Sequence, residues 1–499
     1  MASFESPDFD VLIIGSGFSG IGMAIALKQA KFQTFVILEK AQGVGGTWRD
    51  NTYPGCACDV PSRLYSYSFA PNPNWSEVFA PQAEIKAYLE DCAERYDILD
   101  HVRFGSEVAD AKYDDELSFW RVRTSNGDEI SARIVVSGQG ALHIPKLASI
   151  DGIKDFEGDH FHSASWPENF DLKGRKVGVV GTGASAIQVV PSIAPEVSEL
   201  VVFQRNAPWI QPKPNWKIGK FAAWCFANVP FANSISRTLL YWLLESRLPA
   251  FLSNKSSTFG ERQAKKQLRR QVKDEALRDK LLPREKFGCK RVLLSSDYYP
   301  AIVQDHVTLE TDSIVHVDAQ GIRTDQSYHK LDTIIWCTGF EVTDAAANPL
   351  RIVGRDGRVL QDEMQETAKA YLGISVEGFP NFFMLMGPHT GLGHNSMIYM
   401  IECQIRHVME VVRAMHKNGS MSVEVTHAAQ ESFEREIDRK MIGTVWASGC
   451  QSWYSDASGR ITTIWPDHTF KYRKRTRRLI DGDYEFEQVK TPEPRMKKL

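Results

Sequence analysis

Two stretches of the chain share one arrangement of apolar and small residues. The apolar run VLII (residues 11–14) precedes a glycine-rich turn and the helix-forming segment IGMAIALKQA. The run VGVV (177–180) precedes a second such turn and the segment AIQVVPSIA. Each helix-forming segment is followed by a second apolar run, FVIL or LVVF. The pattern predicts two strand–turn–helix–strand units of the kind that builds doubly wound parallel sheets.

The residues after the first unit follow other patterns. Glycine, proline, asparagine and serine are frequent between 41 and 80, which predicts long loops. Apolar residues at helical spacing predict a helix within 81–98, and residues 102–137 are predicted to form strands with a hairpin turn at Asn126-Gly127. The segment IVVSGQG (134–140) is expected to return to the first sheet, where its small residues bring the backbone close to a bound nucleotide.

The pattern after the second unit completes the predicted architecture. Residues 215–285 are predicted to be mostly helical, and residues 307–324 are β-rich. LDTIIWCTGF (331–340) is another buried strand that ends in small residues, as IVVSGQG does. These elements predict an α/β protein with two Rossmann-like dinucleotide-binding domains, the second inserted in the first. The expected boundaries are 1–148 and 336–499 for the first domain, and 149–335 for the second, with a helical insertion at about 215–290.

The glycine spacing in both turns is that of a dinucleotide-binding motif. The first turn contains Gly15, Gly17 and Gly20, and the second contains Gly181, Gly183 and Ala186. The first glycine permits a tight turn, and the second lets the backbone approach a pyrophosphate. The third position must be small because the helix packs on the strand there. The phosphates are then expected to bind N–H groups at the start of each helix.

The two units end in opposite charges. Glu39 follows Gly15 by 24 positions, and Arg205 follows Gly181 by 24 positions. The residue at this offset meets the adenosine ribose, where an acid binds a free 2′-hydroxyl and an arginine accommodates a 2′-phosphate. The first unit is therefore predicted to bind FAD or NAD, and the second NADP.

Composition narrows the class of protein without naming an activity. The 499 residues are 43% hydrophobic and 24% charged, with a net charge of −3, which gives no general attraction to nucleic acid. The eight cysteines show no metal-ligand spacing, so no metal site is expected. They are expected to be reduced thiols of a cytoplasmic protein. The N-terminus shows no signal-peptide pattern.

Two further segments stand out by composition. Residues 221–252 are strongly apolar, but Pro230, Arg237, Glu245 and Arg247 interrupt them, so no membrane span is expected. A buried helical insertion is favoured there over a membrane-surface helix. The basic cluster KYRKRTRR (471–478) is interpreted as a solvated or domain-packing surface rather than as a site for nucleic acid.

Longer motifs connect the two units to a known family. The segment FEGDHFHSASWP carries Phe156, Gly158, His162, Trp166 and Pro167 in the pattern F-x-G-x-x-x-H-x-x-x-W-P. Here the sequence resembles the Baeyer–Villiger monooxygenases, flavoproteins that insert oxygen next to a ketone carbonyl. A second family pattern lies in GTWRDNTYPGCACD (46–59), and further similar segments are KRVLLSSDYY (290–299), GFPNFFMLMGPHTGLGHNS (378–396) and SWY (452–454).

The resemblance implies FAD on the first unit and NADPH on the second. It also implies a set of site residues, in addition to the motif glycines and the two terminal charges. The residues expected to contact the cofactors are Gly46, Thr47, Trp48, Asp59, Tyr65, Ser185, Lys290 and Trp453, and those expected to be catalytic are Arg291 and Asp59. His162 is expected to position the linker and NADP rather than to transfer a proton.

The chemistry that the resemblance implies explains the need for an arginine. NADPH reduces FAD, the reduced flavin reacts with O₂, and the resulting flavin peroxide attacks a ketone to give an ester or lactone. The peroxide anion and the oxyanion formed by attack both need a fixed positive charge. Arg291 is charged at any working pH and presents a planar fork of donors, and Asp59 would hold it in place. Lys290 is expected to help Arg205 to bind the 2′-phosphate.

Other functions remain possible from the sequence. The related flavin-containing monooxygenases oxidise nitrogen or sulfur, but they usually carry tyrosine or phenylalanine where Trp166 stands. A disulfide reductase needs a redox pair of cysteines, and Cys56-Ala57-Cys58 has the wrong spacing. An NADP-sensing binding protein gives no reason for Arg291 and Asp59. The sequence does not identify the ketone, and it is compatible with a monomer or a weak homo-oligomer.

Overall fold

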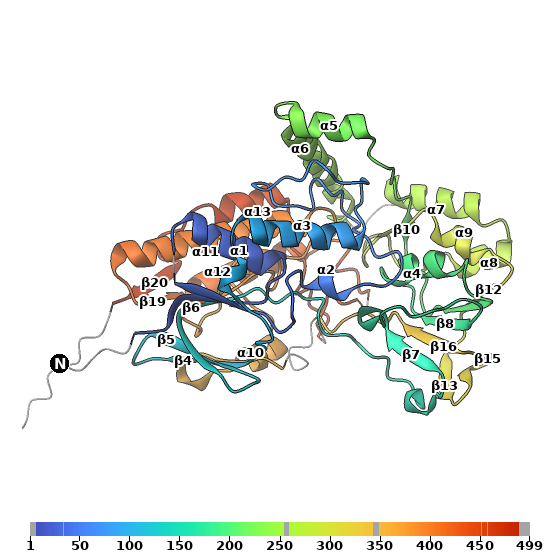
Figure 1. The fold of residues 1–499 in the computed structure, drawn as a ribbon, viewed down its shortest axis with the longest axis horizontal. Helices are drawn as coiled ribbons and strands as arrows, with labels where there is room; N and C mark the ends of the chain where they lie inside the picture. Colours follow the sequence, from blue (N-terminus) through green and yellow to red (C-terminus); the bar gives the residue numbers. More distant parts are fainter. Residues whose placement is uncertain are drawn as a thin grey trace, which may run out of the picture.

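The first glycine-rich unit lies in a large sheet of mixed direction (Figure 1). The computed structural model describes residues 6–32, 34–253, 259–342, 349–450, 452–456 and 458–488. The sheet has eight strands in the order β17-β4-β5-β6-β1-β2-β3, with β18 also paired to β6. Its strands are β1 (Phe9–Ile14), β2 (Phe35–Leu38), β3 (Val102–Arg103), β4 (Val108–Asp114), β5 (Phe119–Thr124), β6 (Glu129–Ser137), β17 (Arg351–Val353) and β18 (Phe382–Met384).

Both faces of strand β1 are buried, which explains its unbroken apolar sequence. Ile13 pairs with Ile37 on one side and with Val136 on the other, both in parallel register. Val11 and Ile13 pack into the core beneath helices α1 (Phe18–Gln29), α3 (Gln82–Arg95) and α11 (Met397–Asn418). Leu12 and Ile14 pack into a second core on the opposite face. The predicted return of the 134–140 segment to this sheet is confirmed.

The predicted hairpin is also present. Strands β5 and β6 pair in antiparallel register on either side of the Asn126-Gly127 turn, and Gly127 has a positive φ of 93°. A side chain with a Cβ is strained at such an angle, so glycine suits this position.

The second glycine-rich unit lies in a sheet of five parallel strands with the order β12-β9-β8-β16-β7. They are β7 (Asp159–His162), β8 (Lys176–Val180), β9 (Glu199–Phe203), β12 (Val307–Glu310) and β16 (Thr333–Trp336). Helices α4 (Ala186–Ile193) and α9 (Tyr298–Ile302) pack together beside it. A small sheet of β13 (Ile314–Asp318), β14 (Gly321–Thr324) and β15 (Tyr328–Lys330) accounts for the rest of the predicted β-rich segment.

The remaining elements connect and cover the sheets. Short strands β10 (Ile210–Gln211) and β11 (Leu293–Leu294) pair with each other, as do β19 (Ser422–Val425) and β20 (Tyr484–Glu487). The further helices outside the 215–285 segment are α2 (Thr47–Asp50), α10 (Leu360–Glu366), α12 (His427–Met441) and α13 (Thr469–Thr476). Residues 41–80 contain only the short α2 and are otherwise loops, as the sequence predicts.

The segment after residue 215 is helical as predicted, but the prediction that 221–252 is buried is wrong for most of it. Within these described residues, only Leu244, Glu245, Leu248 and Phe251 are buried. It forms α5 (Lys220–Asn228) and α6 (Ala232–Glu245), followed by α7 (Phe259–Gln271) and α8 (Glu275–Lys280). No residue of α5 is buried, and α5 and α6 project from the body of the molecule (Figure 1). The apolar pattern predicted a core contact, but no element of the described chain covers the outward apolar side chains of α5 and α6. No helix of the described residues is long and apolar enough to cross a membrane.

The third position of the first glycine motif provides a test of this packing. A Cβ added at Gly20 would lie 1.9 Å from the backbone oxygen of Gly15, so α1 or the turn must shift. We expect Gly20→Ala to lower the free energy of unfolding by about 2 kcal/mol or more, measured by urea denaturation. Gly219→Ala is the matched control, because a Cβ there meets nothing within 4 Å and φ is −66°. Equal losses for the two variants would contradict the packing described.

Candidate active site

The first glycine-rich turn is enclosed by two other small-residue segments. Gly15 has a φ of 88°, and a Cβ there would lie 3.4 Å from the oxygen of Gly138, at the end of β6. On the other side, the Gly45 N–H donates to the Ser16 oxygen at 3.0 Å. A Cβ at Gly46 would lie 3.1 Å from the Cα of Gly17. Three backbone segments therefore converge at the start of α1, where larger side chains would fill the space.

Glu39 is buried beside this turn and already accepts four hydrogen bonds. Its Oε2 accepts from the Ser16 N–H (2.8 Å) and hydroxyl (2.7 Å). Its Oε1 accepts from the Ala41 N–H (3.0 Å) and from Arg49 (3.1 Å). Burial alone would raise the pKa of Glu39, but these donors outweigh it and lower the pKa, so the group is ionised at neutral pH. A ribose hydroxyl that binds Glu39 must replace one of these four donors. Arg49 is the donor with another carboxylate partner, because its guanidinium also binds Asp50.

The second glycine-rich turn has the same construction. Gly181 has a φ of 112°, and a Cβ there would lie 2.4 Å from the oxygen of Cys337, which follows β16. Gly183 faces open space, with nothing within 4 Å of a Cβ. Ser185 stands at the N-cap of α4, and Arg205 is exposed two positions after the end of β9. An open backbone at a helix start and an exposed cation fit the phosphates of a dinucleotide.

The loop after α2 contacts the second unit directly. The Tyr53 hydroxyl donates to Gln188 Oε1 on α4 at 3.0 Å, and Gln188 Nε2 donates to the Ala57 oxygen at 2.9 Å. Gly55 has a φ of 79°, and a Cβ there would lie 2.2 Å from Ser192 Oγ and 2.7 Å from the Gln188 oxygen. The Tyr-Pro-Gly-Cys sequence thus brings the loop against α4, with glycine at the point of closest approach.

The loop that follows α2 and the segment before β11 are joined by an ion pair. Arg291 Nε and Nη2 donate to Asp59 Oδ2 at 3.0 and 2.5 Å, across 232 positions of sequence. The Asp59 carboxylate raises the pKa of Arg291. Burial would raise the pKa of Asp59, but Arg291 holds it below its ordinary value. Both groups are therefore charged throughout the neutral range, and about a third of each side chain is exposed to a possible ligand (33% and 28%).

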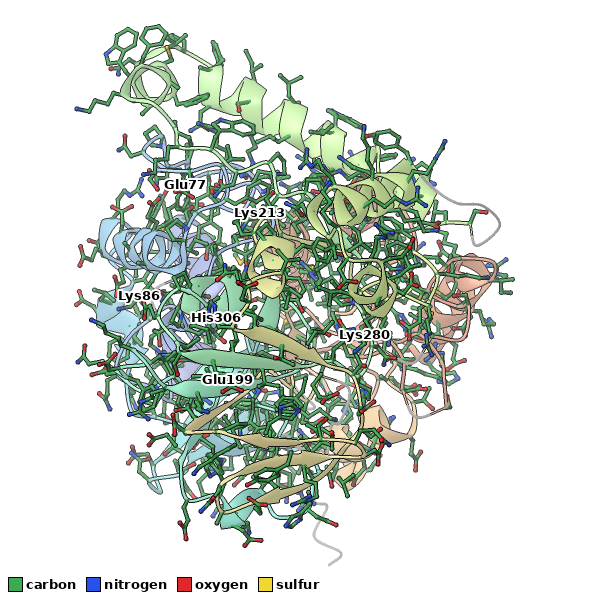
Figure 2. The ribbon with its side chains drawn as sticks, turned by 90° about the vertical axis from the view of Figure 1, so that its right-hand side faces the viewer. Glu77, Lys86, Glu199, Lys213, Lys280 and His306 are labelled. Atoms are coloured by element: carbon green, nitrogen blue, oxygen red, sulfur yellow. A yellow bond between two sulfur atoms is a disulfide. The ribbon has the colours of Figure 1, made fainter. Side chains whose placement is uncertain are left out.

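Three residues that were not selected as catalytic from the sequence lie around this pair: Cys58, Lys213 and Tyr454. Cys58 precedes Asp59 directly in the chain. Lys213 lies at the base of the projecting helices (Figure 2), and burial lowers its pKa although Cys58 and Asp59 favour its charge. Tyr454 is buried, and burial raises its pKa to about 12 despite the nearby Arg291. The SWY segment could have indicated Tyr454, but only its tryptophan was selected from the sequence. Lys213 offered no signal, because a lysine between two prolines is usually solvated.

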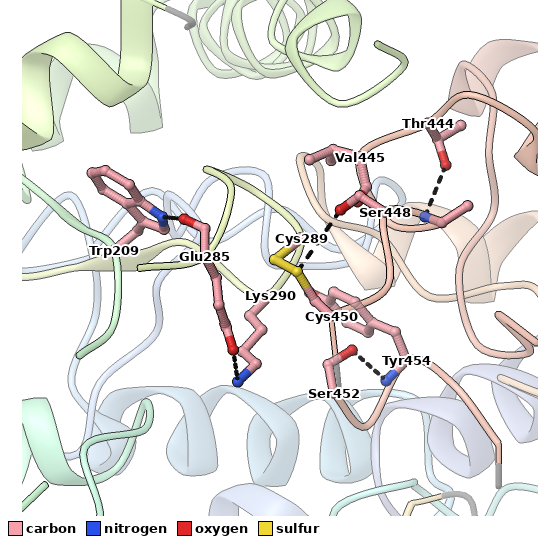
Figure 3. The surroundings of a disulfide bond; sticks show 11 residues. Trp209, Glu285, Cys289, Lys290, Thr444, Val445, Ser448, Cys450, Ser452 and Tyr454 are labelled. Atoms are coloured by element: carbon pink, nitrogen blue, oxygen red, sulfur yellow. Dashed lines mark hydrogen bonds and ion pairs between the residues drawn. A yellow bond between two sulfur atoms is a disulfide. The ribbon is translucent and has the colours of Figure 1, made fainter. Parts of the chain in front are cut away.

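Two predicted nucleotide contacts have protein partners in the structure. Lys290 Nζ lies 2.7 Å from Glu285 Oε1, so a phosphate must compete with that carboxylate for it (Figure 3). Trp453 is 41% exposed, and its ring lies 4.5 Å from the ring of Tyr454. The structure therefore places Trp453 one position from the group that neighbours Arg291, with a face available for a ligand.

The residues of α2 lie between the two units. Trp48 packs against the core of the first sheet and against the core of the second. Its Nε1 donates to the Tyr65 hydroxyl at 3.1 Å, and Tyr65 in turn contacts the ring of Phe18 at the start of α1. Thr47 begins α2 close to Gly140, whose added Cβ would lie 3.9 Å from Thr47 Oγ1. Trp48 therefore contacts both units, and Thr47 and Tyr65 lie beside elements of the first.

The residues of the motif around His162 make capping and packing contacts. His162 ends β7, and its Nδ1 accepts from the Ala164 N–H at 3.1 Å, which caps the following turn. Burial lowers the pKa of His162, so the ring is neutral at pH 7. Trp166 packs edge-to-face on Phe161 at 5.0 Å. A Cβ at Gly158 would lie 2.6 Å from the Asp332 oxygen, which explains the glycine.

The expectation that all cysteines are reduced thiols is wrong for one pair. Cys289 and Cys450 form a disulfide across 161 positions of sequence (Figure 3). It joins the segment that carries Arg291 to the segment that carries Trp453 and Tyr454. No spacing rule connects such distant cysteines, because only the tertiary fold brings them together. Cys56 and Cys58 are free and buried, and burial raises the pKa of Cys56 to about 11, which makes it a poor nucleophile.

The comparisons with known proteins agree with this geometry. Residues 12–219 match the family model described as pyridine nucleotide-disulphide oxidoreductase. A Baeyer–Villiger monooxygenase of Pseudomonas aeruginosa is 44% identical over 95% of this chain and 90% of its own length. One of Streptomyces coelicolor is 42% identical over 97% and 93%. The chain belongs to the Baeyer–Villiger monooxygenase family.

Solved structures of this monooxygenase family show the same fold with cofactors bound. The structure of OTEMO in complex with FAD and NADP has a TM-score of 0.88 and 30% identity, and covers 97% of this chain and all of that chain. Steroid monooxygenase bound to NADP has a TM-score of 0.86 and 31% identity, with 96% and 99% covered. The α/β fold with two Rossmann-like domains is thereby confirmed. The chain is an FAD- and NADPH-dependent flavin monooxygenase, and the disulfide reductase and the binding-protein alternatives are excluded.

The disulfide of this monooxygenase has a measurable consequence. Cys450→Ser removes the link between the Arg291 segment and the Trp453–Tyr454 segment. We expect a loss of about 2–4 kcal/mol in the free energy of unfolding, and faster hydrogen exchange in residues 445–450 and 452–456. Cys225→Ser, at a free and partly exposed cysteine, is the control. Unchanged stability and exchange in Cys450→Ser would show that the link does not stabilise this region.

Proposed function

We propose that this Baeyer–Villiger monooxygenase inserts oxygen beside the carbonyl of a small-molecule ketone, with Arg291 as the catalytic residue and Asp59 as its positioning residue. The observation that carries the proposal is the ion pair between them, which lies where the loop of the first unit meets the segment before β11. An arginine at this place supplies a fixed charge where the loop that follows α2 meets the segment before β11.

The charge of Arg291 suits the reaction. Bound FAD, reduced by NADPH, supplies the activation of O₂. When the ketone carbonyl is attacked, negative charge develops on its oxygen, and a preorganised cation stabilises that charge more than it stabilises the neutral ketone. Asp59 uses one oxygen to hold Nε and Nη2, which leaves Nη1 of the Arg291 guanidinium for the reacting oxygen. Because Asp59 raises the pKa of Arg291, the guanidinium does not lose its proton during the cycle.

The surroundings of the pair exclude water from one side. Tyr454 is 1% exposed beside Arg291, and Cys58 next to Asp59 is also buried. A shielded charge interacts more strongly with a developing oxyanion than a solvated charge does. Lys213 adds a second positive group on the side of Asp59. These residues keep the field at the reacting atoms positive although one carboxylate is present.

The cofactor contacts follow the two turns. We propose that FAD binds at Gly15, Gly17, Gly20 and Glu39, with Gly46, Thr47, Trp48 and Tyr65 around its ring system. NADPH would bind at Gly181, Gly183 and Ser185, with Arg205 and Lys290 at its 2′-phosphate and Trp453 against its nucleotide. The domains are proposed to comprise residues 1–148 and 336–499 for FAD and 149–335 for NADP. We also propose a cytoplasmic protein, monomeric or weakly self-associating, with ketone and O₂ as its small-molecule partners.

The role of Arg291 is tested by its removal. We expect Arg291→Ala to abolish ester formation, with a loss of at least about a hundredfold, because a single oxyanion-stabilising donor contributes that much. Reduction of the flavin by NADPH should continue at a similar rate. Products of a ketone panel are identified by mass, and flavin reduction is followed by its absorbance without oxygen.

Two further variants make this test specific. Arg284→Ala, at an exposed arginine of the same segment, should leave ester formation unchanged. Asp59→Asn keeps the shape of the positioning residue but removes its charge, and should lower kcat more than it changes KM. Ester formation by Arg291→Ala at the wild-type rate would refute the assignment.

Cofactor preference tests Arg205. Its guanidinium is exposed at the end of β9, the place where a 2′-phosphate meets the protein. We expect Arg205→Ala to weaken NADPH by at least about tenfold and NADH little, since only NADPH carries the phosphate. The dissociation constants of both nucleotides are compared by titration. Equal losses for NADH and NADPH would show that another residue reads the phosphate.

A further inference from the structure

The outward face of α5 and α6 is an apolar surface without a partner in the described chain. It is defined by eight large side chains on these helices or directly before them, each more than half exposed: Trp216 before α5, Phe221 and Trp224 on α5, Phe231 before α6, and Ile235, Leu239, Trp242 and Leu243 on α6. Soluble proteins rarely gather so many exposed apolar side chains in one place unless the surface binds something. Figure 2 shows these helices beyond the rest of the molecule, with side chains directed outward.

The opposite face of α6 is anchored to the rest of the molecule by hydrogen bonds. Arg237 donates to the backbone oxygens of Arg63 (2.7 Å) and Ser66 (2.9 Å). Glu245 is buried and accepts hydrogen bonds from Asn395 (2.6 Å) and Thr469 (2.5 Å). Helix α6 is therefore held in place by polar contacts on its inner face. The apolar side chains on the outer face are thus exposed although the inner face of α6 is anchored.

The exposed charges of this segment have one sign. Between residues 213 and 253 the only acidic residue is Glu245, which is buried. Lys217, Lys220 and Arg247 are exposed at the edges of the apolar surface. No carboxylate of this segment therefore faces solvent beside the tryptophans, and the surface suits an anionic partner.

The basic cluster at 471–478 lies next to the apolar surface. Tyr241 on α6 is hydrogen bonded to Thr469 at the start of α13 (3.0 Å), and the ring of Trp242 lies 5.9 Å from that of Phe470. Tyr472 and Thr476 face the core, which turns the cluster outward. The exposed members are Lys471, Arg473, Lys474, Arg477 and Arg478. Within the described residues, Lys474, Arg477 and Arg478 form no ion pair.

We propose that α5, α6 and the basic cluster of α13 form a docking surface for an anionic phospholipid bilayer. Tryptophan and phenylalanine insert at the boundary between headgroups and acyl chains, because their rings are apolar but tolerate a polar neighbour. Lysine and arginine beside them bind the anionic headgroups. The surface combines both features, as interfacial helices do, and no span is needed.

A second copy of this chain fits the same surface less well. A symmetric dimer through α5 and α6 would bring two copies of the same basic cluster toward one another, and like charges would oppose the contact. A bilayer with acidic headgroups neutralises the cluster and covers the apolar side chains at once.

Co-sedimentation of the flavin-loaded enzyme with lipid vesicles tests the proposal. We expect binding to vesicles of phosphatidylcholine with phosphatidylserine, and much weaker binding to vesicles of phosphatidylcholine alone. The paired substitution Trp224→Ser and Leu239→Ser should lower the partition coefficient at least about tenfold, since two inserted apolar side chains are lost. The triple substitution Lys474→Gln, Arg477→Gln and Arg478→Gln should lower it by a similar factor, and raised salt should do the same.

Matched controls separate the surface from general effects. Leu147→Ser replaces a leucine as exposed as Leu239, 66% in both cases, and should leave binding unchanged. Lys266→Gln, Arg269→Gln and Arg270→Gln remove three exposed charges from α7 and should also have little effect. Turnover of a water-soluble ketone confirms that each variant is folded. Absence of wild-type binding, equal loss in the controls, or a change of mass in light scattering without vesicle binding would overturn the proposal.

Discussion

The ion pair between Arg291 and Asp59 is the constraint on which the site depends. Its two members belong to segments 232 positions apart, and each alone would be a charge in a partly buried place. Such a charge is costly unless it is paired, so the pair also specifies how the two segments meet. The close approach of Gly55 to α4 and the hydrogen bonds of Gln188 hold the loop that carries Asp59. The disulfide at Cys289 holds the other side, two positions from Arg291.

The two dinucleotide sites are built by one device used twice. In each sheet the first glycine turns sharply after a buried strand, and the end of a neighbouring parallel strand closes on it. Gly138 plays this part for Gly15, and Cys337 plays it for Gly181. The two units differ in the charge that follows the second strand, since Glu39 is buried among donors and Arg205 is exposed. The fold thus repeats the same backbone arrangement of turn and neighbouring strand, and the two copies differ in the side chain that follows the second strand.

Much of this could be predicted because it depends on local sequence. The strand–turn–helix units, the hairpin at Asn126-Gly127 and the return of residues 134–140 to the first sheet each follow from the spacing of apolar residues and glycines. The membership of Arg291 and Asp59 in one site came from the family resemblance, and the structure then placed them in contact. Lys213 and Tyr454 were missed because their part in the site comes from burial beside that pair, which leaves no pattern along the chain.

The apolar segment 221–252 shows the limit most clearly. Its composition predicted helices correctly, because helix formation depends on neighbours in sequence. It predicted burial wrongly for most of the segment, because burial depends on what else packs against it, and other elements of the described chain pack only against the inner side of α6 and the residues just after it. The pairing of Cys289 with Cys450 and the contact of α6 with α13 are of the same kind. The sequence by itself determined the two nucleotide-binding units and the charges that distinguish them. Only the tertiary structure decided which distant residues share the site and which apolar side chains remain exposed, since both depend on contacts between segments that the chain keeps far apart.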